Sequence, residues 1–483
     1  MNLFPKEEKM NLSMVTDLYE LSMANGYQQA LEKEDGVFDV FFRRVPDDGS
    51  FVITAGLAQA IQAVSNFHFD ENDLAYLKGL NLFTNNFLNF LKNFKFTGNI
   101  SAIPEGTPVF PREPLLTIGG PLIETQLFET ILLNIINHQS LIATKARRIC
   151  YAAQGRPIME FGARRAQGPS AATLGARAAI IGGCASTSNL LAAEKFGLTV
   201  AGTMAHSWIE AFPNELTAFE KWAELYPDNS SLLVDTYDVI DSGVPNAIKV
   251  FKKLEEKGHK PIGIRIDSGD IAHLSKLARK MLDNAGFSEA KITASNALDE
   301  TTIQSLLFSQ QAPIDNFGVG EELITSASDP VLSGVYKLVA IKKDDKVSPK
   351  IKISDSREKV TLPGIKQLYR LYKKGTRQAF ADVIALKDEH LTKRMLVKSA
   401  DPLDTKQNIN LTDFDLETLQ TDIFEKGKAV YSSPTVQQIR KASQLSLNEL
   451  PEETKRLKNP NKYPVYITEK LAKLQDKLLK DQD

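Results

Sequence analysis

Residues 155–330 carry the pattern that most constrains the fold, because short apolar runs alternate there with stretches of helical periodicity. Helices are expected at 171–181, 245–258 and 271–281. Repeated strand-then-helix units imply a parallel sheet, and an irregular α/β barrel of the TIM type is the economical way to close it. The expected strands are 158–161, 198–200, 232–235, 262–266, 291–294 and 316–319.

The flanking regions predict a different organisation. Residues 1–140 mix helical and strand-like patterns and predict an adjoining mixed α/β domain, which a helix from about Leu122 to Ala153 connects to the barrel at 141–334. Residues 335–483 predict strands that return to the N-terminal domain or pair with one another, then a helical C-terminal extension. The expected strands there are 335–341, 350–354 and 368–372.

Composition excludes several classes of protein. The formal net charge of -2 gives no basic footprint for nucleic acid. No run of 18 apolar residues predicts a membrane span. The first ten residues mix Lys and Glu without an apolar core, which is not a secretory signal. Two cysteines cannot form a disulfide framework. A cytoplasmic protein that acts on small molecules is therefore expected.

Polar or glycine-rich segments directly follow the expected strands, and in a barrel such strand ends carry the functional residues. One junction of this kind is ordinary, whereas six in register predict a site. The junctions are Glu160–Arg165, Gly202–Ser207, Asp235–Asp238, Arg265–Asp270, Ser295–Asp299 and Phe317–Gly320.

The residue types at these junctions suit an anionic ligand. Arg265 and one of the adjacent pair Arg164 and Arg165 can bind carboxylate or phosphate, while the other arginine of the pair makes a surface salt bridge. Asp235 and Asp267 can hold Mg²⁺ directly or through its waters. Glycines at the last junction suit a phosphate bound by backbone N–H groups. The expected substrate is phosphorylated and bound with magnesium.

One of the six histidines stands apart. His206 follows an expected strand, a glycine and a threonine, which predicts a functional role. Asp267 is also expected to be functional, because it lies between Arg265 and the Gly269–Asp270 pair. The remaining histidines are expected to be structural: His68, His138, His259, His273 and His390.

In order and spacing, these six motifs resemble the nicotinate phosphoribosyltransferases, from Thr16–Tyr19 to Gly334–Leu338. The resemblance implies a mixed α/β domain beside an irregular barrel, in a homodimer with shared active sites. It implies that nicotinate and phosphoribosyl pyrophosphate give nicotinate mononucleotide and pyrophosphate, the first step of NAD salvage from nicotinate. ATP is hydrolysed to ADP and phosphate through a phosphohistidine.

The resemblance also implies roles for individual residues. His206 would be the phosphohistidine, with Asp267 and Arg265 as the other catalytic residues, and Asp235 and Asp267 would hold Mg²⁺. Tyr19 would enter the site from the other subunit. The nicotinate-binding residues would be Tyr19, Phe161, Arg164, Thr203 and Arg265. The phosphoribosyl pyrophosphate-binding residues would be Arg164, Ser207, Asp235, Asp267, Gly269, Asn296, Gly318 and Gly320.

The sequence departs from the family pattern at Glu321 and Glu322, which follow the glycine-rich junction where a threonine is expected, and at Cys184-Ala185. A carboxylate beside a phosphate is repulsive unless it points away. In the first turn of a helix, however, negative charge is favourable.

Four alternatives are open. A nicotinamide phosphoribosyltransferase is disfavoured because residues 183–186 contain no acid to accept an amide N–H₂. A quinolinate phosphoribosyltransferase is disfavoured by the chain length and by His206. A non-catalytic nucleotide-binding barrel would not need the full set of His206, Arg265, Asp267 and Asp235. An interaction protein that uses the Lys-rich tail at 440–483 would not need His206.

Overall fold

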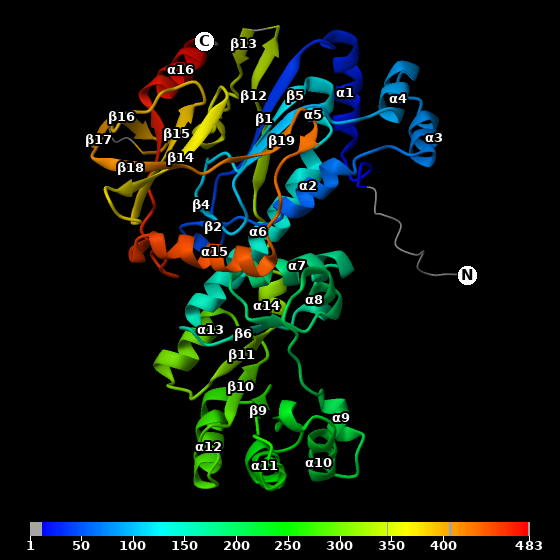
Figure 1. Ribbon diagram of the computed structural model, residues 1–483, viewed down its shortest axis with the longest axis vertical. Helices are drawn as coiled ribbons and strands as arrows, with labels where there is room; N and C mark the ends of the chain where they lie inside the picture. Colours follow the sequence, from blue (N-terminus) through cyan, green and yellow to red (C-terminus); the bar gives the residue numbers. More distant parts are fainter. Residues whose placement is uncertain (1–11, 345, 405–407, 482–483) are drawn as a thin grey trace. The chain divides into compact units, whose positions relative to one another are not determined.

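The chain folds as two units, whose elements Figure 1 shows. The computed structural model describes residues 12–344, 346–404 and 408–481. Unit 1 is made of three chain segments, Met1–Leu141, Val331–Pro434 and Lys441–Asp483. Unit 2 is made of Ile142–Pro330 and Thr435–Arg440. The two ends of the chain therefore complete one unit, and the repeated strand–helix region forms most of the other.

A seven-stranded antiparallel sheet in unit 1 joins strands that lie far apart in the sequence. Its order is β13-β12-β1-β5-β3-β19-β20. Phe38 in β1 lies opposite Ile118 on one side and Leu338 on the other. Strands from beyond residue 334 thus lie beside the N-terminal strands. The strands are β1 (Asp35–Phe42), β3 (Asn99–Ala102), β5 (Leu116–Pro121), β12 (Gly334–Lys343), β13 (Lys346–Pro349), β19 (Thr421–Glu425) and β20 (Lys428–Ala429).

A six-stranded sheet formed entirely from residues after 365 also lies in unit 1. Its order is β17-β16-β21-β15-β14-β18. The expected strand at 350–354 is wrong, because Lys346–Pro349 makes the pairing with β12 instead. The strands are β14 (Lys366–Lys373), β15 (Ala379–Leu386), β16 (Arg394–Ser399), β17 (Ile409–Thr412), β18 (Phe414–Thr418) and β21 (Val465–Thr468).

Helices and a short two-stranded sheet complete unit 1. The two-stranded sheet pairs β2 (Val52–Ile53) with β4 (Pro108–Val109). The expected helix at 122–153 is interrupted at Leu127 and Phe128, which separate α5 from α6. Two helices belong to both units: α6 runs from unit 1 into unit 2, and α15 begins in unit 2 and ends in unit 1. The helices are α1 (Leu18–Ala30), α2 (Leu57–Ser65), α3 (Glu71–Gly79), α4 (Asn85–Lys92), α5 (Leu122–Gln126), α6 (Glu129–Ala152), α15 (Val436–Glu449) and α16 (Glu469–Lys480).

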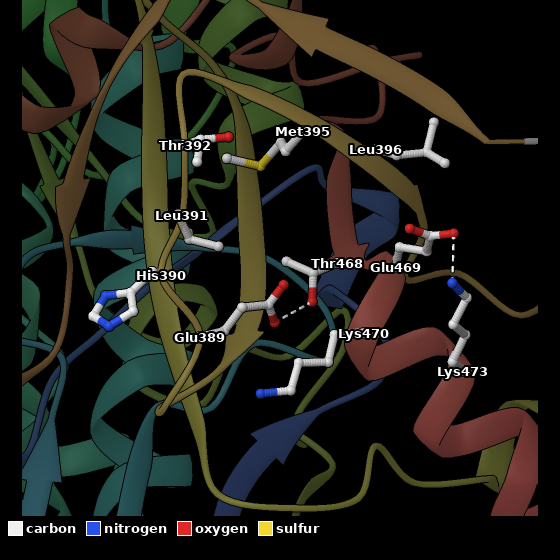
Figure 2. Close-up of a pocket in the computed structure, with 10 residues that line it drawn as sticks. All are labelled: Glu389, His390, Leu391, Thr392, Met395, Leu396, Thr468, Glu469, Lys470 and Lys473. Carbon is white, nitrogen blue, oxygen red and sulfur yellow. Dashed lines mark hydrogen bonds and ion pairs between the residues drawn. The ribbon is translucent and has the colours of Figure 1, made fainter.

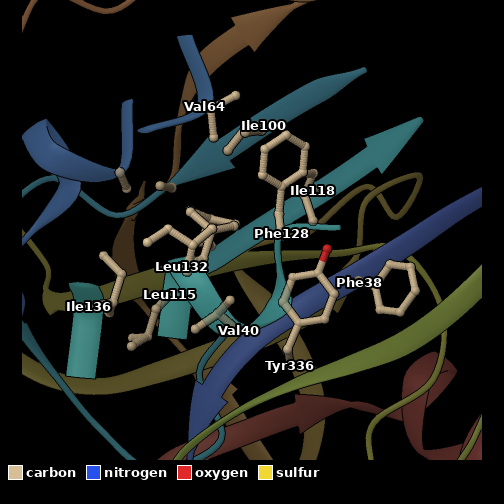
Figure 3. Packing of buried hydrophobic residues seen from close by; sticks show 14 of the residues in the cluster. Phe38, Val40, Val64, Ile100, Leu115, Ile118, Phe128, Leu132, Ile136 and Tyr336 are labelled. Atoms are coloured by element: carbon tan, nitrogen blue, oxygen red, sulfur yellow. The ribbon is translucent and has the colours of Figure 1, made fainter. Parts of the chain in front are cut away.

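The core of unit 1 forms between the first sheet and its helices (Figure 3). The rings of Phe38 and Tyr336 stack with centroids 4.7 Å apart. The Tyr336 hydroxyl donates to the backbone oxygen of Thr125 at 2.5 Å, so its polar atom is satisfied inside the core. Tyr336 lies on β12, and its packing therefore ties the returning strand to the N-terminal segment.

Unit 2 contains the parallel sheet that the sequence predicts. Its order is β7-β6-β11-β10-β9-β8, and every pairing is parallel. Within the described residues the end strands β7 and β8 each pair with one named strand, so the six strands form an open sheet. Closure into a barrel remains a prediction. The strands are β6 (Ile158–Glu160), β7 (Ser186–Thr187), β8 (Ser231–Leu233), β9 (Gly263–Ile266), β10 (Lys291–Ser295) and β11 (Asn316–Val319).

The strand expected at 198–200 is reduced to a single bridge between Val200 and Thr187. Of all helices in the described ranges, none combines the length and apolar character that a membrane span needs. The helices of unit 2 that follow α6 are α7 (Pro169–Gly182), α8 (Leu190–Phe196), α9 (His206–Glu210), α10 (Glu215–Leu225), α11 (Val244–Glu256), α12 (Ile271–Asn284), α13 (Glu300–Gln304) and α14 (Glu321–Ile324).

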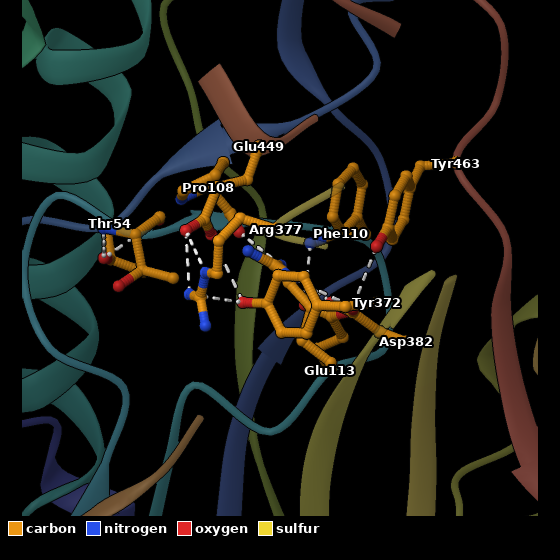
Figure 4. Close-up of polar contacts among 11 residues, drawn as sticks. Thr54, Pro108, Phe110, Glu113, Tyr372, Arg377, Asp382, Glu449 and Tyr463 are labelled. Atoms are coloured by element: carbon orange, nitrogen blue, oxygen red, sulfur yellow. Dashed lines mark hydrogen bonds and ion pairs between the residues drawn. The ribbon is translucent and has the colours of Figure 1, made fainter. Parts of the chain in front are cut away.

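A buried ionic network stabilises the second sheet of unit 1 (Figure 4). Arg370 on β14 donates to both carboxylate oxygens of Asp382 on β15, at 2.9 and 2.7 Å, and to the backbone oxygen of Pro108 at 2.8 Å. Tyr463 donates its hydroxyl to Asp382 at 3.1 Å. Burial raises the pKa of the neighbouring Glu113 carboxyl well above its ordinary value, and the charge of Asp382 adds to this effect.

Glu113→Gln is expected to weaken the pH dependence of stability. The folded protein keeps the Glu113 proton at pH values where the unfolded chain, with a glutamate pKa of about 4.3, has released it. Folding then binds a proton, so the free energy of unfolding falls as the pH rises above that value. Denaturant unfolding across this range should give a shallower fall for Glu113→Gln. Glu71→Gln, at an exposed position, should match the wild type, and equal slopes for all three proteins would contradict the prediction.

Candidate active site

Two aspartates at the ends of adjacent parallel strands form the centre of the candidate site. Asp235 follows β8 and Asp267 follows β9. Asp235 Oδ2 accepts hydrogen bonds from the backbone N–H of Asp267 at 2.9 Å and from the Ser268 hydroxyl at 2.6 Å. Asp235 Oδ1 is buried and has no hydrogen-bond partner in the described part of the chain. A buried carboxylate oxygen of this kind suits a ligand that the protein itself does not supply.

The donor set at this point suits magnesium. Carboxylate oxygens are its preferred ligands, and Mg²⁺ usually binds one or two of them together with waters and substrate phosphates. Among residues 12–344, 346–404 and 408–481, no group of three or more His, Cys, Asp and Glu side chains could hold a metal ion. Asp235 and Asp267 could therefore supply two ligands to a Mg²⁺ ion, and within the described residues they do not form a complete metal site by themselves.

His206 is the first residue of α9, and its ring faces both strand ends. Its Nδ1 lies 3.1 Å from the Thr236 hydroxyl oxygen. Its Nε2 lies 3.8 Å from Asp267 Oδ2. The side chain is 39% exposed, so the imidazole is oriented by protein groups but remains open to a ligand.

Ser295, the last residue of β10, fixes the orientation of Asp267. Its hydroxyl donates to Asp267 Oδ1, which leaves Oδ2 toward His206. Ser295 also lies against β11, since a Cβ atom at Gly318 would be 3.3 Å from the Ser295 Cβ. The structure thus brings His206, Asp235, Asp267 and Gly318 together through contacts at the carboxyl ends of four adjacent strands.

Phe161 covers the glycines at the end of β11. Its backbone N–H donates to the Val319 oxygen at 2.8 Å. A Cβ atom at Gly318 would lie 2.6 Å from the Phe161 ring, and one at Gly320 would lie 3.2 Å from the Phe161 backbone oxygen. Only glycine at position 318 allows the ring to lie this close to the strand.

Buried Glu160 supports the turn that carries this ring. Its carboxylate accepts a hydrogen bond from the Gly162 N–H at 2.5 Å and one from the Thr187 hydroxyl at 2.6 Å. Burial raises the pKa of Glu160, and these hydrogen bonds oppose the rise. The Glu160 carboxylate therefore stabilises the Phe161–Gly162 turn through hydrogen bonds inside the protein.

Gly318→Ala is expected to destabilise the protein and to displace the Phe161 ring. The added methyl group overlaps the ring, and overpacking of this kind costs about 1–3 kcal/mol. Denaturant unfolding measures the loss in the free energy of unfolding. Gly79→Ala is the matched control, because nothing lies within 4 Å of a Cβ there. Equal stability of the two variants would show that the ring yields without cost.

Arg265 lies beside the aspartates with part of its guanidinium available. It donates from one terminal nitrogen to the Met204 backbone oxygen at 3.0 Å, and its buried Nε has no partner in the described residues. Burial lowers the pKa of Arg265, Asp267 and Asp235 oppose this effect, and Arg164 adds to it. The positive charges of Arg164 and Arg265 therefore interact with each other.

Arg165, the residue next to Arg164, forms an ion pair with Glu321 at 3.3 Å. Both side chains are 60% exposed. Arg165 is thus the arginine of the pair that makes the surface salt bridge. Glu321 lies in the first turn of α14 and directs its carboxylate to Arg165.

The remaining predicted residues have less defined surroundings. The Thr203 hydroxyl donates to the backbone oxygen of the next residue, at 3.3 Å. Ser207 is exposed in α9. Gly269 and Asn296, each just after a strand, have left-handed backbones with φ of 78° and 81°. Their predicted roles at the site remain predictions.

Tyr19 belongs to unit 1. It is the second residue of α1, and its side chain is 45% exposed. Burial raises the pKa of its phenol, and the carboxylates of Glu129 and Glu20 add to this. Its predicted entry into the site of another subunit remains a prediction.

A cavity of about 390 Å³ in unit 1 contains none of the predicted site residues (Figure 2). Thr468 in its wall donates to Glu389 at 2.8 Å, and Lys473 pairs with Glu469 at 2.9 Å. Lys470 pairs with Asp388 at 3.1 Å. Its lysines are already neutralised, so the cavity offers no comparable anion site.

Three hydroxyl residues that orient the site were assigned no role from the sequence: Thr236, Ser268 and Ser295. Thr236 and Ser268 each follow a strand-end aspartate directly, and Ser295 ends the next strand. A hydroxyl beside a strand-end carboxylate was the available signal, because it can bond a neighbouring carboxylate or imidazole.

Three family models match the chain. The nicotinate phosphoribosyltransferase (NAPRTase) N-terminal domain matches residues 14–137, the NAPRTase family model matches residues 157–392, and the nicotinate phosphoribosyltransferase C-terminal domain matches residues 365–475. The matches span almost the entire chain and include every predicted site residue.

Individual relatives agree with these models. Nicotinate phosphoribosyltransferase of Bacillus subtilis is 44% identical over 460 residues, which cover 95% of this chain and 93% of the relative. The crystal structure of human nicotinic acid phosphoribosyltransferase matches with a TM-score of 0.84 at 29% identity, over 96% of this chain and 99% of that one. A nicotinate-nucleotide pyrophosphorylase from Pyrococcus furiosus shares the fold, with a TM-score of 0.71 at 24% identity over 93% of this chain and 99% of that one.

Proposed function

The chain belongs to the nicotinate phosphoribosyltransferase family, and we propose that it couples the family's transfer reaction to ATP through a phosphate carried on His206. The chain is an enzyme of NAD biosynthesis that transfers a phosphoribosyl group to nicotinate. The observation that carries the proposal is the placement of His206 between Thr236 and Asp267 at the strand ends.

Magnesium and arginine oppose the charge that develops during transfer. When pyrophosphate leaves the sugar C1, positive charge grows on the ribose ring and negative charge grows on the leaving group. Asp235 and Asp267 lie where carboxylates would hold Mg²⁺, and the ion would stabilise the departing pyrophosphate. The two carboxylates also favour positive charge on the ring. Asp267 has a second role in this proposal, because its carboxylate faces the His206 imidazole that would carry the phosphate.

Nicotinate needs a cationic pocket, because its carboxylate approaches an anionic co-substrate. Arg265, assisted by Arg164, offsets that repulsion, and the buried Nε of Arg265, which has no partner in the described residues, supports this role. The ring of Phe161 provides a face for the pyridine ring. Gly318 and Gly320 lie at the end of β11, where backbone N–H groups would bind the 5′-phosphate, and the Phe161 ring packs against Gly318 on one side. Because Glu321 pairs with Arg165, its charge need not oppose that phosphate.

Subunit assembly is part of the proposal. An aromatic side chain from Tyr19 of a second copy closes the nicotinate pocket in a homodimer with shared sites. The exposed apolar side chains around Tyr19 on α1, Leu18 and Met23, support such an interface. The proposal includes the irregular barrel closure of unit 2 and a cytoplasmic location.

His206→Ala is expected to abolish the stimulation of product formation by ATP and to leave the rate observed without ATP. The measurement is nicotinate mononucleotide formed from nicotinate, phosphoribosyl pyrophosphate and Mg²⁺, with and without ATP. His273→Ala, an exposed histidine on α12, is the control and should keep the stimulation. Retained stimulation in His206→Ala would refute the phosphohistidine. A parallel set with nicotinamide should give little product, and preference for nicotinamide would overturn the substrate assignment.

A further inference from the structure

The two cysteines of the sequence meet inside unit 2. Cys150 lies in the last turn of α6, and Cys184 lies in the connection between α7 and β7. Cys150 Sγ lies against Gly183, the residue directly before Cys184, and the interaction between the two thiols shifts their pKa values in opposite directions. Cys150 is partly exposed and Cys184 is buried. Cys150 is therefore the more exposed of the two cysteines.

Gly183 makes this approach possible. Its φ of 124° is in the left-handed region, and a Cβ atom there would lie 3.3 Å from Cys150 Sγ and 3.5 Å from Cys150 Cβ. The Cys150 side chain thus rests against the backbone one residue before Cys184. A side chain at position 183 would meet Cys150, so glycine lets the Cys150 side chain lie this close to the backbone that leads into Cys184.

Positive charge surrounds the more exposed thiol. Arg440 donates to the Gly183 backbone oxygen at 3.1 Å, and Arg147 lies one helical turn before Cys150. The hydrogen bond from Cys184 lowers the pKa of Cys150, Arg147 and Arg440 act in the same direction, and burial opposes them. The same hydrogen bond and burial raise the pKa of Cys184 well above its ordinary value. Cys150 is therefore the thiol of the pair that loses its proton more readily, and Cys184 is the one that keeps it.

We infer that Cys150 and Cys184 form an oxidative modification site, at which oxidised glutathione or a similar small disulfide produces an intramolecular disulfide. The Cys150 thiolate attacks one sulfur of the small disulfide, forms a mixed disulfide and releases one small thiolate. Cys184 then loses its proton, attacks the Cys150 sulfur and expels the second small thiolate. The two protein thiols are oxidised, and one small disulfide is reduced to two thiols.

The proposed disulfide would lie close in sequence to residues that position the candidate site. Cys184 lies two residues before β7, and Thr187 of that strand donates its hydroxyl to Glu160. Glu160 in turn holds the Phe161–Gly162 turn. The inference concerns thiol chemistry alone and does not depend on the proposed function.

The test treats the full-length protein with oxidised glutathione, blocks the remaining thiols with iodoacetamide and measures the intact mass and the peptide map. The wild type is expected to lose both blockable thiols, to become lighter by two hydrogen atoms and to yield one peptide pair that links Cys150 to Cys184. Dithiothreitol should restore both thiols. The inference would be overturned if iodoacetamide still blocked both thiols after the treatment with oxidised glutathione. A persistent glutathione adduct, or a disulfide between two chains, would also overturn it.

Two variants separate the roles of the thiols. Cys184→Ser should keep one glutathione on Cys150, because the thiol that would expel it is absent. Cys150→Ser should take up no glutathione, because Cys184 is buried. Equal reactivity of the two single variants would overturn the assignment of Cys150 as the nucleophile. The wild-type peptide map decides whether the disulfide forms even if either variant fails to fold.

Discussion

Asp235→Asn is expected to lower kcat/KM for nicotinate mononucleotide formation by about 10²–10³-fold, the usual cost of removing one positioned electrostatic group from an active site. Asp235 is buried, and its Oδ2 accepts hydrogen bonds from the Asp267 N–H and from Ser268. An amide cannot accept these bonds and also offer a charged oxygen to Mg²⁺. Steady-state rates over a Mg²⁺ titration measure both losses, and the variant should need more Mg²⁺ for half-maximal rate.

The matched control for this experiment is Asp228→Asn. Asp228 is an exposed carboxylate of the same unit, and it pairs with His259 at 2.8 Å. Its rate and Mg²⁺ requirement should equal those of the wild type. An Asp235→Asn enzyme that matches this control would remove Asp235 from the proposed magnesium site.

Arg370→Met is expected to lower the free energy of unfolding by about 3–5 kcal/mol, because it leaves a buried carboxylate without its partner. Arg370 and Asp382 are fully buried and joined by two hydrogen bonds. Glu113 lies beside Asp382, so the loss of the guanidinium also leaves two acids together. Denaturant unfolding measures the loss in the free energy of unfolding. The m-values of the variant and the wild type are compared, because equal m-values mean that only stability has changed.

Two further variants test that explanation. Lys374→Met breaks an exposed ion pair with Asp413 and should change stability little. The double variant Arg370→Met with Asp382→Leu removes both buried charges and should recover part of the loss. No recovery in the double variant would mean that the side-chain packing of Arg370, and not its charge, stabilises this region.

The sequence predicted those strands of unit 2 whose apolar runs are long enough to be recognised. Ile264 and Ile266 in β9, and Ile292 and Ala294 in β10, are fully buried, and their pattern is unambiguous. β7 was missed because Ser186 and Thr187 are polar, and their strand geometry depends on pairing with β6. The run at 198–200 has strand-like residues, but only one bridge is available to it. The local pattern of apolar residues predicted which segments are buried. Pairing with neighbouring strands in the folded sheet decided which of these segments became strands.

The site was predictable to a similar depth. Sequence alone placed Asp235 and Asp267 at strand ends, because a polar residue after an apolar strand is visible in one dimension. The strand expected before His206 is only a single bridge, and His206 instead begins α9. Sequence alone could not predict that Thr236 faces one nitrogen of His206 and Asp267 the other. These contacts join segments about thirty to sixty residues apart, and they depend on the order of the strands in the sheet, which periodicity does not encode.

The division of unit 1 into three chain segments sets an order of events during synthesis. The strands β1, β5 and β3 leave the ribosome early, but the strands that cover their two outer edges, β12 and β19, belong to the last third of the chain. At about 5–20 residues per second, those edges wait on the order of ten seconds or longer. Most of unit 2 is one continuous segment and can fold in that interval. The nascent protein is therefore expected to expose the unpaired edges of this sheet while unit 2 folds, and exposed strand edges promote aggregation.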